Sequence, residues 1–267
     1  MIIPHKLHEK GGFHIDDNLY NSIIEVPKRI AKNKDCVALI VGDPGNGKST
    51  LGATIGYVWD NDIINQKCFF STIKDFKQYQ LSLLNKKENR GKVIIHDEAR
   101  ETGGLNVMSK DIRAFWDLIY ENRFLNMYQI LIQSDFFKIP RDIIFNRALF
   151  LLWVVEDQDW SNGIYYFFSK RNMIRLYDEA KRNYNYRPRY YDFSGRFVSF
   201  WAADPEYLKQ KENNFIQKYK NSNEKNINKY NELLKRIINY DGIKESLKME
   251  ILGIKKSRFY YLKRTIE

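Results

Sequence analysis

Cysteine and long apolar runs are both scarce in this sequence. The 267 residues include two cysteines, Cys36 and Cys68, too few for a disulfide scaffold, which favours a reducing compartment. The longest apolar run, Ala148–Val155, falls far short of the ~20 residues that cross a bilayer. Residues 1–12 lack the apolar core of a signal peptide. We therefore expect a cytoplasmic protein with no membrane span.

Proline is scarce and internal repeats are absent, which excludes several classes of protein. Six prolines, with 43% hydrophobic and 29% charged residues, exclude wholesale disorder, and no period of 20–50 residues indicates a solenoid or propeller. Acidic residues are outnumbered: 44 Lys and Arg stand against 33 Asp and Glu, which gives a net charge of +11. Such an excess favours a polyanionic partner, nucleic acid first.

Short apolar runs alternate with helical patterns through the first two-thirds of the chain. This alternation predicts an α/β fold whose parallel sheet is covered on both faces. The predicted parallel strands are Cys36–Val41, Cys68–Ser71, Val93–His96 and Gln129–Gln133. Ala148–Val155 and Ile164–Ser169 are expected to add a hairpin. Ser109 is the expected N-cap of a helix whose apolar face carries Ile112, Phe115, Trp116, Ile119 and Tyr120.

The composition changes near residue 205. From Glu206 to the end there are 15 Lys and Arg against 8 Asp and Glu, so +7 of the total charge lies in this tail. Three apolar stripes at helical spacing predict a small all-α domain, and we place the boundary near residue 222, giving domains 1–221 and 222–267. The stripes are Ile227, Tyr230, Leu233, Leu234, Ile237 and Ile238; Ile243, Leu247 and Ile251; and Phe259, Leu262 and Ile266.

One motif carries specific chemistry. The segment Gly42-Asp43-Pro44-Gly45-Asn46-Gly47-Lys48-Ser49 fits G-x-x-x-x-G-K-[ST], between a predicted strand and a predicted helix that begins near Thr50. Glycines let backbone N–H groups turn toward phosphates, and the positive end of the helix adds to the field. Lys48 is expected to meet the β and γ phosphates of ATP, and Ser49 to bind Mg²⁺.

A second motif supplies carboxylates. The predicted strand Val93–His96 runs into Asp97 and Glu98, which would stand at the sheet edge where α/β proteins bind ligands. Asp97 is expected to hold Mg²⁺ through water, and Glu98 to polarise the attacking water. We therefore expect one pocket where two neighbouring strands end, with ATP and Mg²⁺ as cofactors. His96 is expected to be a packing residue.

Together these motifs resemble the P-loop ATPases with an additional strand and a catalytic glutamate. Asp97-Glu98-Ala99, Arg123, Gln133 and the run Ile139-Pro140-Arg141-Asp142-Ile143 are similar to the FtsK/HerA-like DNA translocases, which include plasmid and viral coupling and packaging ATPases and the Zot-like relatives. The resemblance covers about residues 31–155. Ile132 stands where the group usually has a threonine.

The resemblance implies roles for two further residues and an assembly. Gln133 would sense the γ-phosphate from the neighbouring strand, or would only satisfy backbone groups at a strand end. Arg123 would be an arginine finger that reaches a neighbouring subunit, with Arg141 and Arg147 as rivals, or an exposed arginine at a helix end. A finger that works in trans implies a homo-oligomer, commonly a hexameric ring in this group.

The C-terminal segment resembles a helix-turn-helix, with Gly253 in the turn. Its second helix would place Lys255, Lys256, Ser257 and Arg258 toward the major groove of double-stranded DNA, with Lys263 and Arg264 at phosphates. The alternative is a helical bundle used for oligomerisation. A second basic stretch, residues 181–196, mixes arginines with tyrosines, which suits either single-strand contact or a packed surface.

The expected fold is thus a three-layer P-loop NTPase with a C-terminal helix-turn-helix domain. The expected activity is that of an ATP-hydrolysing DNA motor, for translocation or packaging, of viral or mobile-element type, which would place it in a host cytoplasm. An ATP-switched DNA-binding protein, such as a replication initiator or helicase loader, is the alternative. A small-molecule kinase would not need Glu98, Gln133 and a basic tail together.

Overall fold

The computed structural model describes residues 1–83, 90–97, 110–156, 163–213, 238–239, 244–252, 256, 259–260 and 263, with the backbone alone at 110–111. The chain falls into two units, Met1–Tyr207 and Leu208–Glu267, and each is described by itself. The boundary predicted near residue 222 lies outside the described residues, so it stays a prediction. Glu98 and Ser109 also lie outside them.

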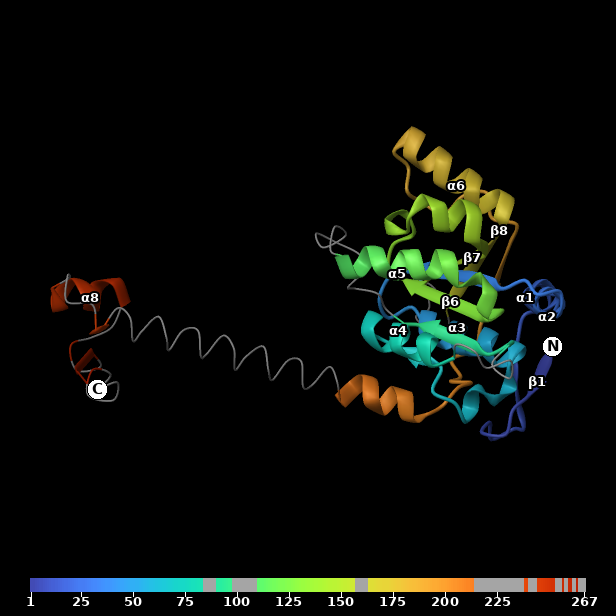
Figure 1. Ribbon diagram of the computed structural model, residues 1–267, viewed down its shortest axis with the longest axis horizontal. Coiled ribbons are helices and arrows are strands. Elements are labelled where there is room, and N and C mark those ends of the chain that lie inside the picture. The colour runs from blue at the N-terminus through green and yellow to red at the C-terminus, as the bar shows by residue number, and fades with distance from the viewer. Residues whose placement is uncertain are drawn as a thin grey trace. The chain divides into compact units, whose positions relative to one another are not determined.

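A seven-stranded sheet forms the centre of the first unit, in the order β4-β5-β6-β3-β7-β8-β9 (Figure 1). The strands from β4 to β7 along this order run parallel, whereas β8 pairs antiparallel with β7 and β9 pairs antiparallel with β8. Their bounds are β3 Cys36–Gly42, β4 Phe69–Phe70, β5 Val93–His96, β6 Tyr128–Gln133, β7 Ala148–Val155, β8 Ile164–Ser169 and β9 Phe193–Arg196. The predicted mostly parallel α/β sheet is confirmed, and so is the antiparallel pairing of β7 with β8.

Helices cover both faces of the sheet, which gives the three layers that the sequence predicts. β3 is buried along its whole length because its side chains alternate between two cores. Ala38 and Ile40 face α1 and α3, whereas Leu39 and Val41 face α4, α5 and α6 (Figure 1). The helices of this unit that have defined bounds are α1 Asp17–Ile23, α2 Pro27–Ala31, α3 Lys48–Trp59, α4 Ile73–Ser82, α5 Lys110–Glu121 and α6 Lys170–Asn183.

The strand order corrects one expectation about the site. β3 and β5 are not neighbours, because β6 lies between them and pairs with both. Val41 of β3 stands beside Gln133, and Ile95 of β5 stands beside Ile130. Local patterns cannot locate such an inserted strand, because parallel strands are joined by long crossovers rather than by tight turns; only the resemblance to ATPases with an additional strand pointed to it. The site is therefore built on three strands, not two.

Helix α3 lies very close to the sheet. A Cβ atom placed on Gly56 would stand 3.2 Å from methyl carbons of Ile63 and Val93 and 3.3 Å from one of Ile95. Since real Cβ contacts are rarely so short, glycine lets this turn of the helix rest on β5. The approach holds the first turn of α3 over the ends of the central strands.

The predicted apolar face of α5 is confirmed at four of its five positions. Ile112, Phe115, Trp116 and Ile119 are buried in the core shared with α4 and α6. Tyr120, however, is 48% exposed, so its place on the buried face was wrong. Tyr120 lies at the edge of the apolar arc, where a phenol can keep its hydroxyl in water at little cost. None of the described helices is long and apolar enough to cross a membrane.

The described part of the second unit contains α8, Glu245–Leu252, and a small core of Ile238 and Phe259. The stripe predicted on α8 was wrong, because Leu247 and Ile251 are about half exposed. The buried face of α8 is shifted by one residue from the predicted stripe, because Lys248 rather than Leu247 is buried. Its Nζ donates to the carbonyl oxygen of Ile238 at 2.6 Å. A lysine can take a core position when its ammonium finds a backbone carbonyl. The helix-turn-helix itself stays a prediction.

The first unit also carries a small N-terminal hairpin. β1, Ile2–Pro4, pairs antiparallel with β2, Gly12–His14. His5 follows β1, is buried, and lies 3.2 Å through Nε2 from the carbonyl oxygen of Ala202. Its Nδ1 accepts from the backbone N–H of Leu7, so Nε2 is the donor to Ala202, and burial lowers the pKa of His5. This bond ties the hairpin to the segment that follows β9.

Candidate functional site

The glycine-rich loop at residues 42–49, called the phosphate loop below, joins the end of β3 to the start of α3. Gly47 is the N-cap residue of α3 and has a left-handed backbone, with φ 83° and ψ 18°. A non-glycine residue is strained there, and a Cβ atom would stand 3.0 Å from the ring of Phe197. Glycine at this position therefore lets the first N–H groups of α3 open toward the loop.

Lys48 is the first residue of α3, and most of its side chain is buried. Its Nζ donates to the carbonyl oxygen of Asp43 at 2.6 Å, which folds the side chain back over the loop. The positive charge thus stays against the phosphate loop rather than extending into solvent. Asp43, Pro44 and Gly45 are exposed, so their backbone is accessible to a ligand.

Ser49 and Asp97 meet, although 48 residues separate them in the sequence. Ser49 Oγ donates to Asp97 Oδ1 at 2.7 Å. Asp97 follows β5 directly and is only 1% exposed, and its backbone N–H donates to Phe70 of β4 at 2.8 Å. A hydroxyl and a carboxylate are the hard oxygen ligands that Mg²⁺ takes in nucleotide sites, so these two side chains fit a magnesium ion. Thr50, the next residue of α3, is half-buried.

Gln133 ends β6 and is buried beside Val41, the residue before the phosphate loop. Asp97, Gln133 and Gly42 thus lie at the carboxyl ends of three parallel strands, which share one edge of the sheet. This edge is where open α/β sheets bind ligands. The structure therefore brings together Lys48, Ser49, Asp97 and Gln133, whereas Glu98 lies outside the described residues.

His96 packs as the sequence predicts. Its ring lies 5.2 Å from that of Phe76 and 4.7 Å from that of Phe115, centroid to centroid. Burial lowers the pKa of His96 to about 4, so the ring is neutral near pH 7. Within the described residues neither ring nitrogen has a hydrogen-bond partner.

The arginines proposed as fingers lie elsewhere. Arg123 is exposed in a 3-10 turn that precedes β6, so it stands at the opposite edge of the sheet from Gln133, about 20 Å along the strand. It cannot reach its own phosphate loop, and action on a neighbouring subunit stays a prediction. Arg141 is exposed and stacks on Phe145 at 4.1 Å. Arg147 is buried and paired with Asp35, which removes it as a rival.

The predicted DNA contacts are only partly described. Lys256 is helical and exposed. Lys263 Nζ pairs with Glu245 at 2.8 Å, and Tyr260 donates to the same carboxylate at 2.8 Å. These bonds lower the pKa of Glu245. Lys255, Ser257, Arg258 and Arg264 lie outside the described residues.

The basic stretch at residues 181–196 is mostly a packed surface. Tyr186 packs on Phe137, Tyr190 lies under the guanidinium of Arg175 and Tyr191 packs on Tyr166, at centroid distances of 4.8, 4.0 and 4.6 Å. Tyr184 is 83% exposed, and Tyr186 and Tyr191 keep about half of their surface exposed despite these contacts. Arg182, Arg187 and Arg189 are exposed. The packing interpretation therefore holds for most of the tyrosines.

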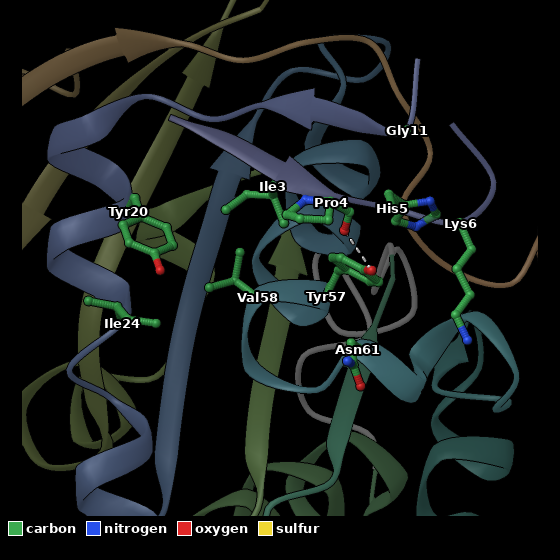
Figure 2. A pocket seen from close by; sticks show the side chains of 10 residues that line it. All are labelled: Ile3, Pro4, His5, Lys6, Gly11, Tyr20, Ile24, Tyr57, Val58 and Asn61. Atoms are coloured by element: carbon green, nitrogen blue, oxygen red, sulfur yellow. Dashed lines mark hydrogen bonds between the residues drawn. The ribbon is translucent and has the colours of Figure 1, made fainter. Parts of the chain in front are cut away.

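A pocket of about 620 Å³ lies at the other end of α3 (Figure 2). Its walls come from β1, α1 and the last turns of α3, and include Ile3, Tyr20, Tyr57 and Val58. Tyr57 donates to the carbonyl oxygen of Pro4 at 2.9 Å across it. Because α3 rises about 1.5 Å per residue, this pocket is well over 10 Å from the phosphate loop. The residues singled out by the sequence motifs converge at the other end of α3, so this pocket is separate from the candidate site.

Two aromatic residues at the site were missed by sequence reasoning. Phe197 covers Gly47, and Tyr207 donates from its hydroxyl to Asp97 Oδ2 at 2.9 Å. They lie 100 and 110 positions after Asp97 in the sequence. Neither belongs to a spaced motif, so no local signal in the sequence connects them with the phosphate loop.

Comparisons with known proteins give little further guidance. No protein-family model and no curated protein sequence matches this chain. Among solved structures, the crystal structure of the N-terminal domain of zonular occludens toxin from Neisseria meningitidis is similar at 11% identity and a TM-score of 0.38, covering 65% of this chain and 96% of that one. So distant a likeness carries no argument. What the chain's own geometry gives is a mostly parallel seven-stranded sheet flanked by helices, compatible with the P-loop NTPase fold.

Proposed function

We propose that this protein binds ATP with Mg²⁺ at the phosphate loop, hydrolyses it, and uses the energy to move DNA, in translocation or packaging by a virus or mobile element. The main support for ATP binding and hydrolysis is the 2.7 Å hydrogen bond from Ser49 to Asp97. Two motifs found independently in the sequence meet there, at the edge of the sheet where ligands bind.

The residues around this bond fit a magnesium nucleotide. The N–H groups at the start of α3 would bind phosphate oxygens, and Lys48 would leave the carbonyl of Asp43 to meet the β and γ phosphates. Ser49 and Asp97 would hold Mg²⁺, the latter through water. When bound, the ion would neutralise charge on the phosphates.

Hydrolysis needs an oriented water, and two side chains are proposed for that task. Glu98, next to Asp97 in the sequence, would polarise the water, and Gln133 would contact the γ-phosphate from the strand between the loop and the carboxylate. Phosphoryl transfer depends mainly on positioning and charge, so two fixed polar groups suffice for this role.

The DNA part of the proposal rests on charge. The chain carries +11, and +7 of it lies from Glu206 onward. Lys255, Lys256, Arg258, Lys263 and Arg264 are the proposed cations that meet double-stranded DNA. A homo-oligomer, as a hexameric ring, would let Arg123 serve a neighbour's site, since it stands far from its own.

A switch rather than a motor is the second candidate. In a replication initiator or helicase loader, hydrolysis would time assembly on DNA and transport nothing. The phosphate loop of this chain, Gly42-Asp43-Pro44-Gly45-Asn46-Gly47-Lys48, resembles that group's loop as well. A basic C-terminal domain that holds DNA suits both candidates.

Two substitutions test the ATPase. Lys48→Ala is expected to abolish ATP binding and turnover, whereas the control Lys28→Ala, which removes an exposed lysine paired with Glu25, leaves both unchanged. Glu98→Gln is expected to keep ATP binding and stop hydrolysis. Calorimetry and phosphate release measure these effects. Normal turnover in Lys48→Ala would remove the site assignment.

A strand-displacement assay separates the motor from the switch. A motor removes the third strand of a DNA triplex in the presence of ATP and Mg²⁺, and long DNA stimulates its turnover more than short DNA. A protein that hydrolyses ATP, binds DNA and leaves the triplex intact is a switch. Native mass with ATP and Mg²⁺, with and without duplex DNA, tests the ring.

A further inference from the structure

The segment from Phe197 to Tyr207 runs past the phosphate loop and ends at Asp97. At one end, the Phe197 ring lies over Gly47, the N-cap of α3. At the other end, the Tyr207 hydroxyl donates to Asp97 Oδ2 at 2.9 Å, and Tyr207 is buried. This segment therefore contacts both halves of the proposed nucleotide site.

The two oxygens of Asp97 have different donors. Oδ1 accepts from Ser49, the proposed Mg²⁺ ligand, and Oδ2 accepts from Tyr207. With both oxygens held, the plane of the carboxylate is fixed and Oδ1 is directed at the phosphate loop. Without the hydroxyl of Tyr207 the carboxylate would be less restrained about its χ2 bond, since that torsion has a broad energy well.

Tyr207 is itself held by aromatic packing. Its ring stacks on that of Trp201 at 5.9 Å with a 10° interplanar angle, and lies 4.8 Å from that of Phe69. Trp201 Nε1 donates to the carbonyl oxygen of Asp204 at 2.9 Å, which fixes the indole. Phe69 belongs to β4, the strand beside β5. The phenol of Tyr207 thus packs on β4, the strand next to the one that ends at Asp97.

We propose that Tyr207 is a positioning residue: it orients Asp97 so that one carboxylate oxygen faces the Mg²⁺ of the bound nucleotide. The proposal rests on the proposed ATP site and adds a residue that no motif marks. Groups that orient a metal ligand in this way are typically responsible for 10–100-fold in metal affinity. Tyr207 lies in a helical segment that includes residues 206–213.

Tyr207→Phe removes the hydroxyl and keeps the ring, so the stack with Trp201 survives. We expect ATP binding in EDTA to be unchanged, because the phosphate loop is intact, and the Mg²⁺ concentration at half-saturation of ATP binding to rise about tenfold. Mn²⁺ used in place of Mg²⁺ reports the ion directly, and its electron paramagnetic resonance signal should show about tenfold weaker binding in the presence of ATP.

Tyr57→Phe is the matched control. Its hydroxyl also donates to a protein oxygen at 2.9 Å, but at the far end of α3. We expect it to leave the Mg²⁺ requirement unchanged. If Tyr207→Phe needs the same Mg²⁺ concentration for ATP binding and binds Mn²⁺ as tightly as the unaltered protein, this inference is wrong, whereas the proposed ATP site still stands. Absence of ATP binding by the unaltered protein would overturn the proposed function, and the inference with it.

Discussion

Arg147 and Asp35 form a buried ion pair at the edge of the sheet opposite the phosphate loop. Each side chain is less than 10% exposed. Arg147 donates through Nη1 to Asp35 Oδ1 at 3.1 Å, through Nη2 to Oδ2, and through Nε to the carbonyl oxygen of Ile119 at 3.1 Å. With three of its N–H groups engaged, this arginine holds β3 and β7 to α5 and serves the fold.

Replacing Arg147 by methionine should destabilise the protein strongly. Asp35 would then be a buried carboxylate without its partner, and we expect a loss of about 3–5 kcal/mol in the free energy of unfolding. The double variant Arg147→Met, Asp35→Val removes both charges and should recover most of that loss. Urea unfolding measures both. A stable Arg147→Met protein with reduced ATP turnover would instead indicate a finger.

At this scale, local motifs in the sequence point to residues that the structure brings together. Lys48 and Ser49 follow from one spaced pattern, and Asp97 from the polar end of an apolar strand. Tyr207 could not be predicted, because its role comes from a hydrogen bond across 110 positions. A phenol near a strand end has no sequence signature, since tyrosines pack on surfaces throughout this chain.

The approach of α3 to β5 is a close packing of a helix on the sheet that depends on a single glycine. Gly56 makes it possible, since any larger side chain would press on Ile63, Val93 and Ile95. The contact matters for the site because α3 begins at Lys48. A tilt of α3 would move the whole first turn relative to Asp97.

A graded pair of substitutions tests this contact. Gly56→Leu should overpack the interface and lower the free energy of unfolding by about 1–3 kcal/mol. In Gly56→Ala the single methyl group meets the Cδ1 atoms of Ile63 and Ile95 and Cγ1 of Val93 at 3.2–3.3 Å, and a helix propensity gain of about 1 kcal/mol offsets part of this crowding. Thermal unfolding of both variants gives the comparison. Equal stability of the leucine variant and the unaltered protein would contradict the packing argument.

The six predicted strands agree with the structure to within one residue at their ends, because continuous apolar runs are typical of strands covered on both faces, whereas β1, β2 and β9 were not predicted. The order of the strands could not be predicted. The burial of side chains on amphipathic helices was also hard to predict. Three residues fit an apolar stripe in the sequence and yet face solvent, namely Tyr120, Leu247 and Ile251. The exact rotation of a helix is set by its neighbours, here by Lys248 on α8.

Charge is the property of the whole molecule that bears most on its partner. The tail from Glu206 holds about a third of the basic residues of the chain, 15 of 44. When these cations bind DNA phosphates, they would release the counterions that surround the DNA. The affinity of the protein for DNA should therefore fall steeply as the salt concentration rises. Part of this charge is already neutralised inside the second unit, where Lys263 pairs with Glu245.

Truncation after Asn221 tests where DNA binds. The shortened chain should keep its ATP affinity, because each described residue of the nucleotide site lies before this point. Its affinity for duplex DNA should fall, and the slope of log affinity against log salt should become shallower by about 4, for the loss of five proposed cations. Fluorescence anisotropy at several salt concentrations measures the slope. An unaltered slope would move the DNA site to the first unit.

The central position of β3 has a consequence for how the protein is made. β3 leaves the ribosome early, yet its hydrogen-bonding partners, β6 and β7, are encoded about 90 and 110 residues later. At roughly 5–20 residues per second, the nascent strand waits for many seconds with both edges unpaired. During synthesis a fully apolar segment, Cys36–Gly42, is therefore open to aggregation or chaperone capture until residue 155 has emerged.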